Sequence, residues 1–385
     1  MQYIPILLYF ISFSVSAQST KISYTVEKVA DDFQFVEGPV WKDGRLLFSD
    51  IPANTIYSWH PNSGTSVYLS PSGNSNGLAL DSEGRLLLAQ HGKRSISLIQ
   101  NDRTEIQLAG SYRGKKLNSP NDLAVKSDGS IFFTDPPYGI NATEEELGFY
   151  GIYRVNSDGH LRLLDASLKR PNGIAFSPDE SKLYVNDSEV RKIYVWDVVN
   201  DSMIVNKQLF ASMNVDGYAD GMKTDPTGYL FSAGPIGIWV FSPDGEVLDT
   251  IPIPGQTTNC GWGAEGSNTL FVTSGTAVFK VTVIMTDIGD KRQGYNKSPS
   301  FELFNNYPNP FNGKTFLHFD LFQSGNVNIS ILNNNGEKVD MVINRFLNSG
   351  TYQIPWAAGN FSSGMYFAHM QTSAGTADTK CLLIK

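Results

Sequence analysis

The stretch "RPNGIAFSPDESKLYVND", from Arg170 to Asp187, contains a complete hairpin pattern. Asn172 and Gly173 precede a short apolar run, and Ser-Pro-Asp-Glu then has the composition of a tight turn. Leu-Tyr-Val forms the returning run, so the stretch predicts two antiparallel strands. Asn172 has two interpretations: a turn residue that merely precedes Gly173, or one member of a set of equivalent residues.

The same pattern occurs six times in the first three quarters of the chain, in units that start 39 to 51 residues apart. The units begin with "EGPVW" at Glu37, "NGLAL" at Asn76, "NDLAV" at Asn121, "NGIAF" at Asn172, "DGMKT" at Asp220 and "CGWGA" at Cys260. With the runs between them, such as "KIYVW" and "GIWVF", each unit has about four short strands, which is typical of a β-propeller blade. The sequence therefore predicts an all-β fold with a six-bladed β-propeller over residues 21–283. The strand "ISYTVEKV" is expected to close the ring by joining the last blade.

The residues that open the six units are expected to meet at the central channel, because the innermost strand of every blade lines it. Five of them carry a side-chain oxygen, and Glu37 and Asp220 are carboxylates. Oxygen ligands of this kind suit a hard divalent cation, with Ca²⁺ expected first. No His or Cys cluster with zinc spacing is present. Cys260 is in phase with the set but is expected to be a small buried residue.

The motifs "EGPVW", "LNSPNDLAVKSDGSIFFTDPPYG", "RPNGIAFSPDESKLYV" and "ADGMKTDPTGYL" together resemble the gluconolactonase family, which includes regucalcin. The resemblance implies a propeller with one channel metal and lactone-hydrolase activity. Its metal ligands correspond to Glu37, Asn172 and Asp220, with Asn121 as a further ligand or a substrate contact. Asp220 matches the family's proposed general base, and Mg²⁺, Mn²⁺ and Zn²⁺ are alternatives to Ca²⁺.

Further residues are candidates for substrate contact beside the metal set. His91 is expected where a strand ends near the channel mouth, and Tyr138 and Trp262 are aromatic side chains that could wall a sugar. Asn76 and Asn118 are candidates for binding hydroxyl groups. Ser119 stands where animal members of the family have a substrate-contacting Arg, so the preferred sugar lactone is left open.

The two ends of the chain predict export. Residues 1–17, "MQYIPILLYFISFSVSA", form an apolar run that ends in small residues and predict a cleaved signal peptide. After a polar linker at 284–300, residues 301–385 predict a small Ig-like β-sandwich. Its motifs "NYPNPFN", "GMYFAHMQT" and "KCLLIK" resemble the sorting domain of the type IX secretion system. The resemblance implies passage through the periplasm to the outer-membrane surface or the medium. The alternative for this tail is a carbohydrate-binding or spacer module.

The net charge and the cysteine content argue against some classes of partner and against a disulfide. The net charge of −8 argues against a nucleic-acid partner, which would require a basic face. Cys260 and Cys381 lie in different predicted domains and are not expected to form a disulfide. The main interpretation is a secreted, monomeric, metal-dependent lactonase acting on a sugar lactone. The alternatives are an organophosphate or aryl-ester hydrolase that uses the same metal site, and a non-catalytic binding propeller.

Overall fold

The computed structural model describes residues 19–156, 159–199, 203–264, 268–288, 301–304, 306–334, 336–372 and 375–385. The chain divides into two compact units, Met1–Gly289 and Asp290–Lys385, and each is treated by itself. The predicted signal peptide at 1–17 and most of the predicted linker lie outside the described residues. All regular elements of the described residues are strands, as the sequence predicts, and none of these residues form a helix that could cross a membrane.

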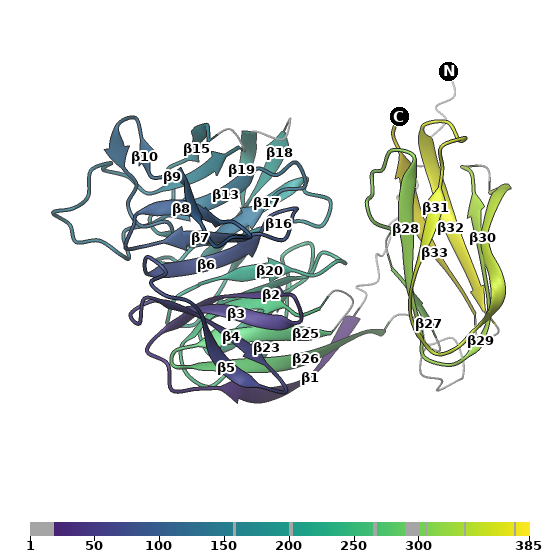
Figure 1. Ribbon diagram of the computed structural model, residues 1–385, viewed down its shortest axis with the longest axis horizontal. Helices are drawn as coiled ribbons and strands as arrows, with labels where there is room; N and C mark the ends of the chain where they lie inside the picture. The colour runs from purple at the N-terminus through teal and green to yellow at the C-terminus, as the bar shows by residue number, and fades with distance from the viewer. Residues whose placement is uncertain are drawn as a thin grey trace, which may run out of the picture. The chain divides into compact units, whose positions relative to one another are not determined.

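The first unit contains six four-stranded antiparallel sheets, the blades of the propeller (Figure 1). Blade 1 comprises β2 (Val36–Lys42), β3 (Arg45–Asp50), β4 (Thr55–His60) and β5 (Gly64–Leu69). Blade 2 comprises β6 (Ser75–Leu80), β7 (Leu86–Gln90), β8 (Ser95–Ile99) and β9 (Glu105–Ala109). Blade 3 comprises β12 (Leu123–Val125), β13 (Ile131–Asp135), β14 (Gly151–Val155) and β15 (Leu161–Asp165). A two-stranded ribbon, β10 (Ser111–Tyr112) and β11 (Lys115–Lys116), precedes blade 3.

The other three blades follow the same order. Blade 4 comprises β16 (Pro171–Phe176), β17 (Lys182–Asp187), β18 (Lys192–Val199) and β19 (Met203–Ser212). Blade 5 comprises β20 (Met222–Thr224), β21 (Leu230–Gly234), β22 (Gly237–Phe241) and β23 (Val247–Pro252). Blade 6 comprises β24 (Thr257–Trp262), β25 (Thr269–Ser274), β26 (Ala277–Ile288) and β1 (Ser19–Ala30).

Strand β1 closes the ring, as the sequence predicts. It lies antiparallel to β26 over a register that runs from Ser19 opposite Ile288 to Ala30 opposite Val278. In Figure 1 the purple β1 therefore lies beside the green β26, although the two strands are at opposite ends of the unit's sequence. Because β26 continues to Ile288, the last strand extends beyond residue 283, where the sequence places the end of the propeller.

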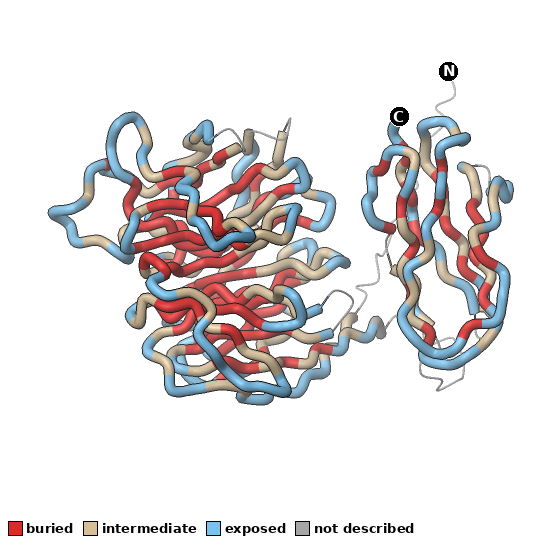
Figure 2. The backbone as a smooth tube through the Cα atoms, in the orientation of Figure 1, coloured by how far each residue is buried: buried red, intermediate tan, exposed pale blue. Residues whose placement is uncertain are grey.

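The hydrophobic core of the propeller consists of six clusters, each between two neighbouring blades. Leu47 and Leu88 belong to the cluster between blades 1 and 2, and Phe48 and Phe271 to the one between blades 1 and 6. The remaining four clusters bridge blades 2 to 3, 3 to 4, 4 to 5 and 5 to 6. Figure 2 shows the buried segments running through the blades. Apolar packing thus joins blade to blade, and the centre of the ring is left to other side chains.

The second unit is a two-sheet β-sandwich. One sheet contains β27 (Phe301–Leu303), β28 (Lys314–Leu321) and β31 (Gly350–Ala357). The other contains β29 (Gly325–Leu332), β30 (Lys338–Leu347), β32 (Gly364–Thr372) and β33 (Gly375–Leu383). The sheets enclose one apolar core around Trp356, Phe319 and Leu317. The alternating burial along β28 is the pattern that places every second side chain in such a core.

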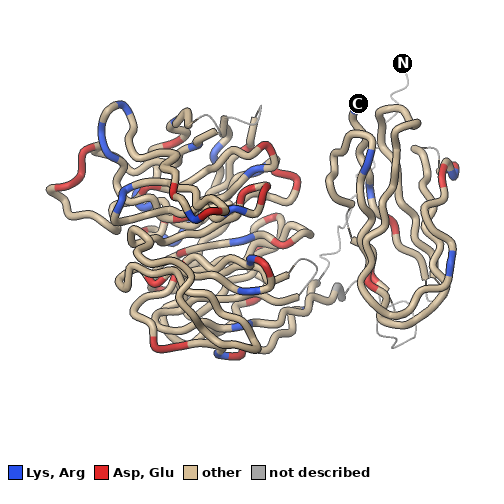
Figure 3. Tube along the Cα trace, in the orientation of Figure 1, with Lys and Arg blue, Asp and Glu red and all other residues tan. Residues whose placement is uncertain are grey.

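The two cysteines lie in different units, and charged residues are spread along the chain. Cys260 and Cys381 are both buried and unpaired. Figure 3 shows acidic and basic residues interspersed along the propeller, with fewer of either kind in the sandwich.

Candidate functional site

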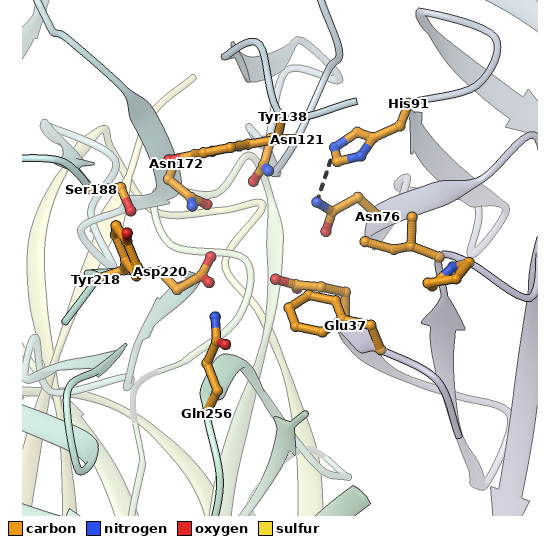
Figure 4. A pocket seen from close by; sticks show the side chains of 13 residues that line it. Glu37, Asn76, His91, Asn121, Tyr138, Asn172, Ser188, Tyr218, Asp220 and Gln256 are labelled. Atoms are coloured by element: carbon orange, nitrogen blue, oxygen red, sulfur yellow. Dashed lines mark hydrogen bonds between the residues drawn. The ribbon is translucent and has the colours of Figure 1, made fainter. Parts of the chain in front are cut away.

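A pocket of about 350 Å³ lies where the inner strands of the propeller converge (Figure 4). Seven residues singled out from the sequence line it. These are Glu37, Asn76, His91, Asn121, Tyr138, Asn172 and Asp220. In Figure 4 the side-chain oxygens of Glu37, Asn172 and Asp220 face a common space, with the Asn121 amide beside them. The ring of equivalent positions therefore exists as a spatial cluster.

Close contacts between blades explain why Gly follows several ring residues. A Cβ atom on Gly173 would lie 2.3 Å from the carbonyl oxygen of Asp220 in the next blade, and one on Gly77 would lie 2.6 Å from that of Asn121. The Gly77 N–H donates to this Asn121 carbonyl at 2.8 Å. Asn-Gly in these units is thus a blade-to-blade contact, because only Gly permits so close an approach.

In the sixth unit the residue at the ring position lies two residues earlier in the chain than the comparison of the six repeats predicts. The Gly221 N–H donates to the Thr258 carbonyl at 2.8 Å, as Gly77 does to Asn121, so Thr258 occupies the ring position. Cys260 packs instead in the apolar cluster between blades 5 and 6. Burial raises the pKa of its thiol to about 12, so it remains neutral. The expectation of a small buried residue is confirmed, and its assignment to the ring is wrong.

The carboxylate of Glu37 is buried, and one of its two oxygens accepts hydrogen bonds from the protein. Its Oε2 accepts hydrogen bonds from the Gly38 N–H at 2.8 Å and from Asn259 Nδ2 at 2.9 Å. Burial raises the pKa of Glu37 to about 7, and the charge of Asp122 adds to this rise while the Asn259 bond opposes it. Burial also raises the pKa of Asp220 well above its usual value, with further contributions from Glu37 and Asp122.

Negative charge exceeds positive charge in this buried cluster. Glu37, Asp122 and Asp220 are three buried carboxyl groups, and the positive charge that acts on Glu37 and Asp122 is Lys223, whose Nζ lies 3.8 Å from Asp122 Oδ2. Burial is the main reason why the pKa values of Glu37 and Asp220 are raised, and repulsion from neighbouring carboxylates adds to it: from Asp122 on Glu37, and from Glu37 and Asp122 on Asp220. A bound divalent cation would offset two unit charges and make both carboxylates stable in the ionised state.

Unpaired amide oxygens give a second test of whether a cation fits. Asn172 Oδ1 and Asn76 Oδ1 are buried and have no hydrogen-bond partner among the described residues. Buried polar atoms are normally paired, so such an oxygen indicates a missing partner. Within the described ranges, no group of three or more His, Cys, Asp or Glu side chains could hold a metal. Two carboxylates with neutral amide oxygens fit a hard cation such as Ca²⁺ better than Zn²⁺.

His91 and Tyr138 are neutral members of the pocket wall. Asn76 Nδ2 and His91 Nε2 are 3.1 Å apart, the hydrogen bond drawn in Figure 4. Burial lowers the pKa of His91 to about 4, so its imidazole is uncharged at neutral pH. Burial likewise raises the pKa of Tyr138 to about 12, and the guanidinium of Arg170 lies 5.6 Å from the centre of its ring.

Two candidate substrate contacts lie outside the pocket lining, and those predictions are corrected. Asn118 is fully buried, and its Nδ2 donates to the carbonyls of Asp135 and Phe149 at 3.2 Å and 3.0 Å. Trp262 donates from Nε1 to the Thr224 carbonyl at 2.8 Å and packs edge-on against Phe231. The N–H groups of both side chains are thus used by neighbouring strands and loops, and neither residue faces the pocket.

The pocket also contains residues that the sequence argument missed. These are Phe35, Ile51, Pro52, Ser188, Tyr218 and Gln256. They lie in loops or strand ends outside the six aligned positions, so the repeat gives no signal for them. Asn259, which holds Glu37, was missed for a related reason, since the alignment placed Cys260 in the ring.

The fold and the site together define a class of protein: six-bladed β-propellers with an oxygen-lined pocket at the centre of the ring. Residues 35–276 match the family model described as SMP-30/gluconolactonase/LRE-like region. The chain belongs to this family. Residues 305–385 match the secretion system C-terminal sorting domain, so the sandwich is a sorting domain, which indicates export with secretion or surface attachment.

Individual relatives agree with this assignment. A gluconolactonase of Zymomonas mobilis is 38% identical over 291 residues, covering 68% of this chain and 82% of the relative. The solved structure of a gluconolactonase from Xanthomonas campestris is 34% identical, with a TM-score of 0.64 over 67% of this chain and 89% of the other. A calcium-binding regucalcin from Agrobacterium tumefaciens has a TM-score of 0.57 over 67% of this chain and 93% of its own, but at 20% identity it shows the fold alone. The named gluconolactonases support an enzyme of the lactonase type.

Proposed function

We propose that this protein is an exported hydrolase that opens sugar lactones and depends on a divalent cation, with Ca²⁺ the first candidate. The observation that carries the proposal is the convergence of Glu37, Asn172 and Asp220 on one space where buried carboxyl groups outnumber positive charges. The similarity to gluconolactonases supports the reaction class. The predicted signal peptide and the sorting domain support a route through the periplasm to the cell surface or the medium.

The cation would be held by Glu37, Asn172 and Asp220, with Asn121 as a further ligand or as a contact to the substrate. These side chains offer only oxygens to a cation, and two of them are carboxylates, which matches the ligand preference of Ca²⁺. Once bound, a divalent cation supplies a Lewis acid that polarises the lactone carbonyl and stabilises negative charge on its oxygen.

We assign to Asp220 the role of orienting the water molecule that attacks the lactone. Its carboxylate accepts a hydrogen bond from this water and orients it toward the carbonyl carbon. As the new C–O bond forms, the ring C–O bond breaks, and the proton of the water is transferred to the leaving ring oxygen. The product is the open-chain hydroxy acid. A carboxylate that also binds a cation has a lowered pKa and is a weak base, so orientation is the larger part of this role.

The wall of the pocket selects a neutral substrate. No Lys or Arg is among the residues that line it, and its histidine is held neutral by burial. A phosphate or sulfate group on the sugar would therefore find no Lys or Arg in the lining itself, and Arg170 lies behind the wall, 5.6 Å from the ring centre of Tyr138. Tyr138 and Tyr218 are 41% and 64% exposed, and such rings provide flat faces against which the carbon side of a sugar can pack.

A pH-stat assay with glucono-1,5-lactone tests the proposal directly, because ring opening releases acid. Purified protein should accelerate hydrolysis above the spontaneous rate, and the acceleration should disappear after chelation and return with Ca²⁺. Parallel assays with a phosphotriester and an aryl ester test whether the site prefers those substrates. Absence of catalysis with every lactone and ester, in protein that still binds a cation, would contradict the hydrolase and favour a binding propeller.

A further inference from the structure

The two oxygens of the Glu37 carboxylate are in different environments. Oε2 accepts both the Gly38 N–H at 2.8 Å and Asn259 Nδ2 at 2.9 Å, and these two donors come from blades 1 and 6. Neither bond involves Oε1. Glu37 is only 2% exposed, so its carboxylate meets the pocket and protein atoms rather than bulk water. A carboxylate with one oxygen committed to two donors has a single oxygen left for a ligand.

The orientation of the Asn259 amide is itself fixed. Its Oδ1 accepts the N–H of Cys260 at 2.8 Å, which leaves Nδ2 as the group that faces Glu37. The side chain is 2% exposed and fits tightly against blade 5, where a Cβ atom on Gly221 would lie 1.9 Å from Asn259 Cγ. Gly221 is thus needed for Asn259 to occupy this place. The amide has little freedom to turn or withdraw.

Asn259 belongs to a layer directly behind the ring residues. The residue after each ring position is Gly in four blades, and it is Asp122 in blade 3 and Asn259 in blade 6. Asp122 and Asn259 adopt the same local arrangement, since Oδ1 of each accepts the next backbone N–H, at 2.9 Å and 2.8 Å. Asp122 has Lys223 as its charged neighbour, whereas Asn259 supplies a donor to a carboxylate. An aspartate at position 259 would provide no N–H for Glu37.

We propose that Asn259 is a positioning residue for the cation site: it locks Glu37 so that Oε1 alone is presented to the pocket. The proposal rests on the proposed function in one respect, namely that the pocket binds a divalent cation. It predicts that Asn259 acts on cation affinity through Glu37 and makes no contact with the substrate. One-oxygen binding by Glu37 also leaves room at the cation for water and the lactone carbonyl.

Calorimetric titration of Ca²⁺ into the full-length, chelator-stripped protein tests this role without relying on activity. Asn259→Leu should weaken Ca²⁺ binding by roughly 10-fold to 100-fold, the usual effect of losing a residue that orients a metal ligand. Gln90→Leu is the matched control. Gln90 is also a fully buried amide that donates to a carboxylate, Glu105 Oε1 at 3.1 Å, but it lies outside the pocket lining. It should leave the affinity within about twofold, since it touches no proposed ligand.

A double-mutant cycle separates positioning from general damage to the fold. In a Glu37→Gln background, Asn259→Leu should cause no further loss of affinity, because the group on which it acts has been replaced. Asn259→Ser, which is too short to reach Glu37, replaces Asn259→Leu if the latter does not fold. Equal Ca²⁺ affinity in wild-type protein and both Asn259 variants would overturn the positioning role alone. Failure of wild-type protein to bind any divalent cation would overturn the proposed metal dependence as well.

Discussion

The centre of the propeller and the centre of the sorting domain are built from different side chains. The sandwich encloses a continuous apolar core in which Trp356 and Phe319 are fully buried. The propeller places its apolar clusters between blades and leaves carboxylates and amides on its axis. Buried carboxylates cost free energy unless they have partners, so the propeller keeps at its centre an arrangement that a purely structural core would avoid. The axis of the propeller therefore carries polar side chains that could take part in a reaction, whereas the centre of the sandwich serves packing.

The largest effect should come from removing a carboxylate of the propeller. Asp220→Asn keeps the shape of the side chain but removes its charge and its capacity to take a proton. We expect kcat/KM for a sugar lactone to fall by about 10³-fold, within the range for loss of an acid–base group. Lactone hydrolysis and Ca²⁺ titration should be measured on the same preparation. A variant with full cation affinity and full activity would remove Asp220 from the mechanism.

Removing the cation should affect the propeller and spare the sandwich. A ligand that binds only the folded state stabilises it by about 2.7 kcal/mol at 100 times its dissociation constant. Chelation should therefore lower the melting temperature of the propeller transition, and excess Ca²⁺ should restore it. Scanning calorimetry measures this. A shift of the same size in a sample of the isolated sorting domain would show that the effect does not come from the channel.

His91 should make the propeller sensitive to mild acid. The pKa of His91 is lowered from 6.5 to about 4 in the folded state, so the unfolded chain binds more protons between these values. The contribution of His91 to the free energy of unfolding is therefore fully present above pH 6.5 and is lost as the pH falls toward 4. At pH 5 the loss is about 2 kcal/mol. Urea unfolding at pH 7.5 and 5.0 should show a smaller pH effect in His91→Gln than in wild-type protein.

The smallest effect should come from removing the sorting domain. Truncation after residue 300 leaves all the residues that line the pocket, and the two units are compact by themselves. We expect kcat/KM to stay within about twofold of the full-length value, since separate domains with their own cores fold independently. The lactone assay on the truncated protein measures this. A large loss of activity in a folded truncation product would assign part of the site to the sandwich.

The repeat was sufficient to predict the fold, because its period reports strand count and blade size directly. The same phase brought Glu37, Asn121, Asn172 and Asp220 together, since equivalent positions of a closed ring meet at one height. The prediction from the repeat was wrong in blade 6, because Gly261 follows Cys260 in the sequence just as a Gly follows most of the ring residues. A Cβ atom on Gly261 would meet the Pro39 carbonyl at 2.2 Å, so that Gly serves a different contact.

Residues contributed by loops could not be predicted in this way. Gln256 and Tyr218 enter the pocket from segments outside the repeat, and their positions depend on loop conformation rather than on strand phase. Trp262 and Asn118 show the opposite error. Their residue types suit a sugar site, but their N–H groups donate to neighbouring backbone carbonyls and neither side chain lines the pocket. Residue type and spacing identify candidates, and only the packing decides which side chains face the pocket.

The pairing of β1 with β26 has a consequence for the order of folding. The first strand of the propeller has no partner in the sheet until the last one is available, because its register runs from Ser19 opposite Ile288. Five blades can form from local hairpins, but the sixth requires contacts across nearly the whole unit, which form slowly. We therefore expect closure of the circle to be a late step of folding. Until it occurs, blade 6 lacks its outer strand, and the Glu37–Asn259 bond between blades 1 and 6 has no completed ring to hold it.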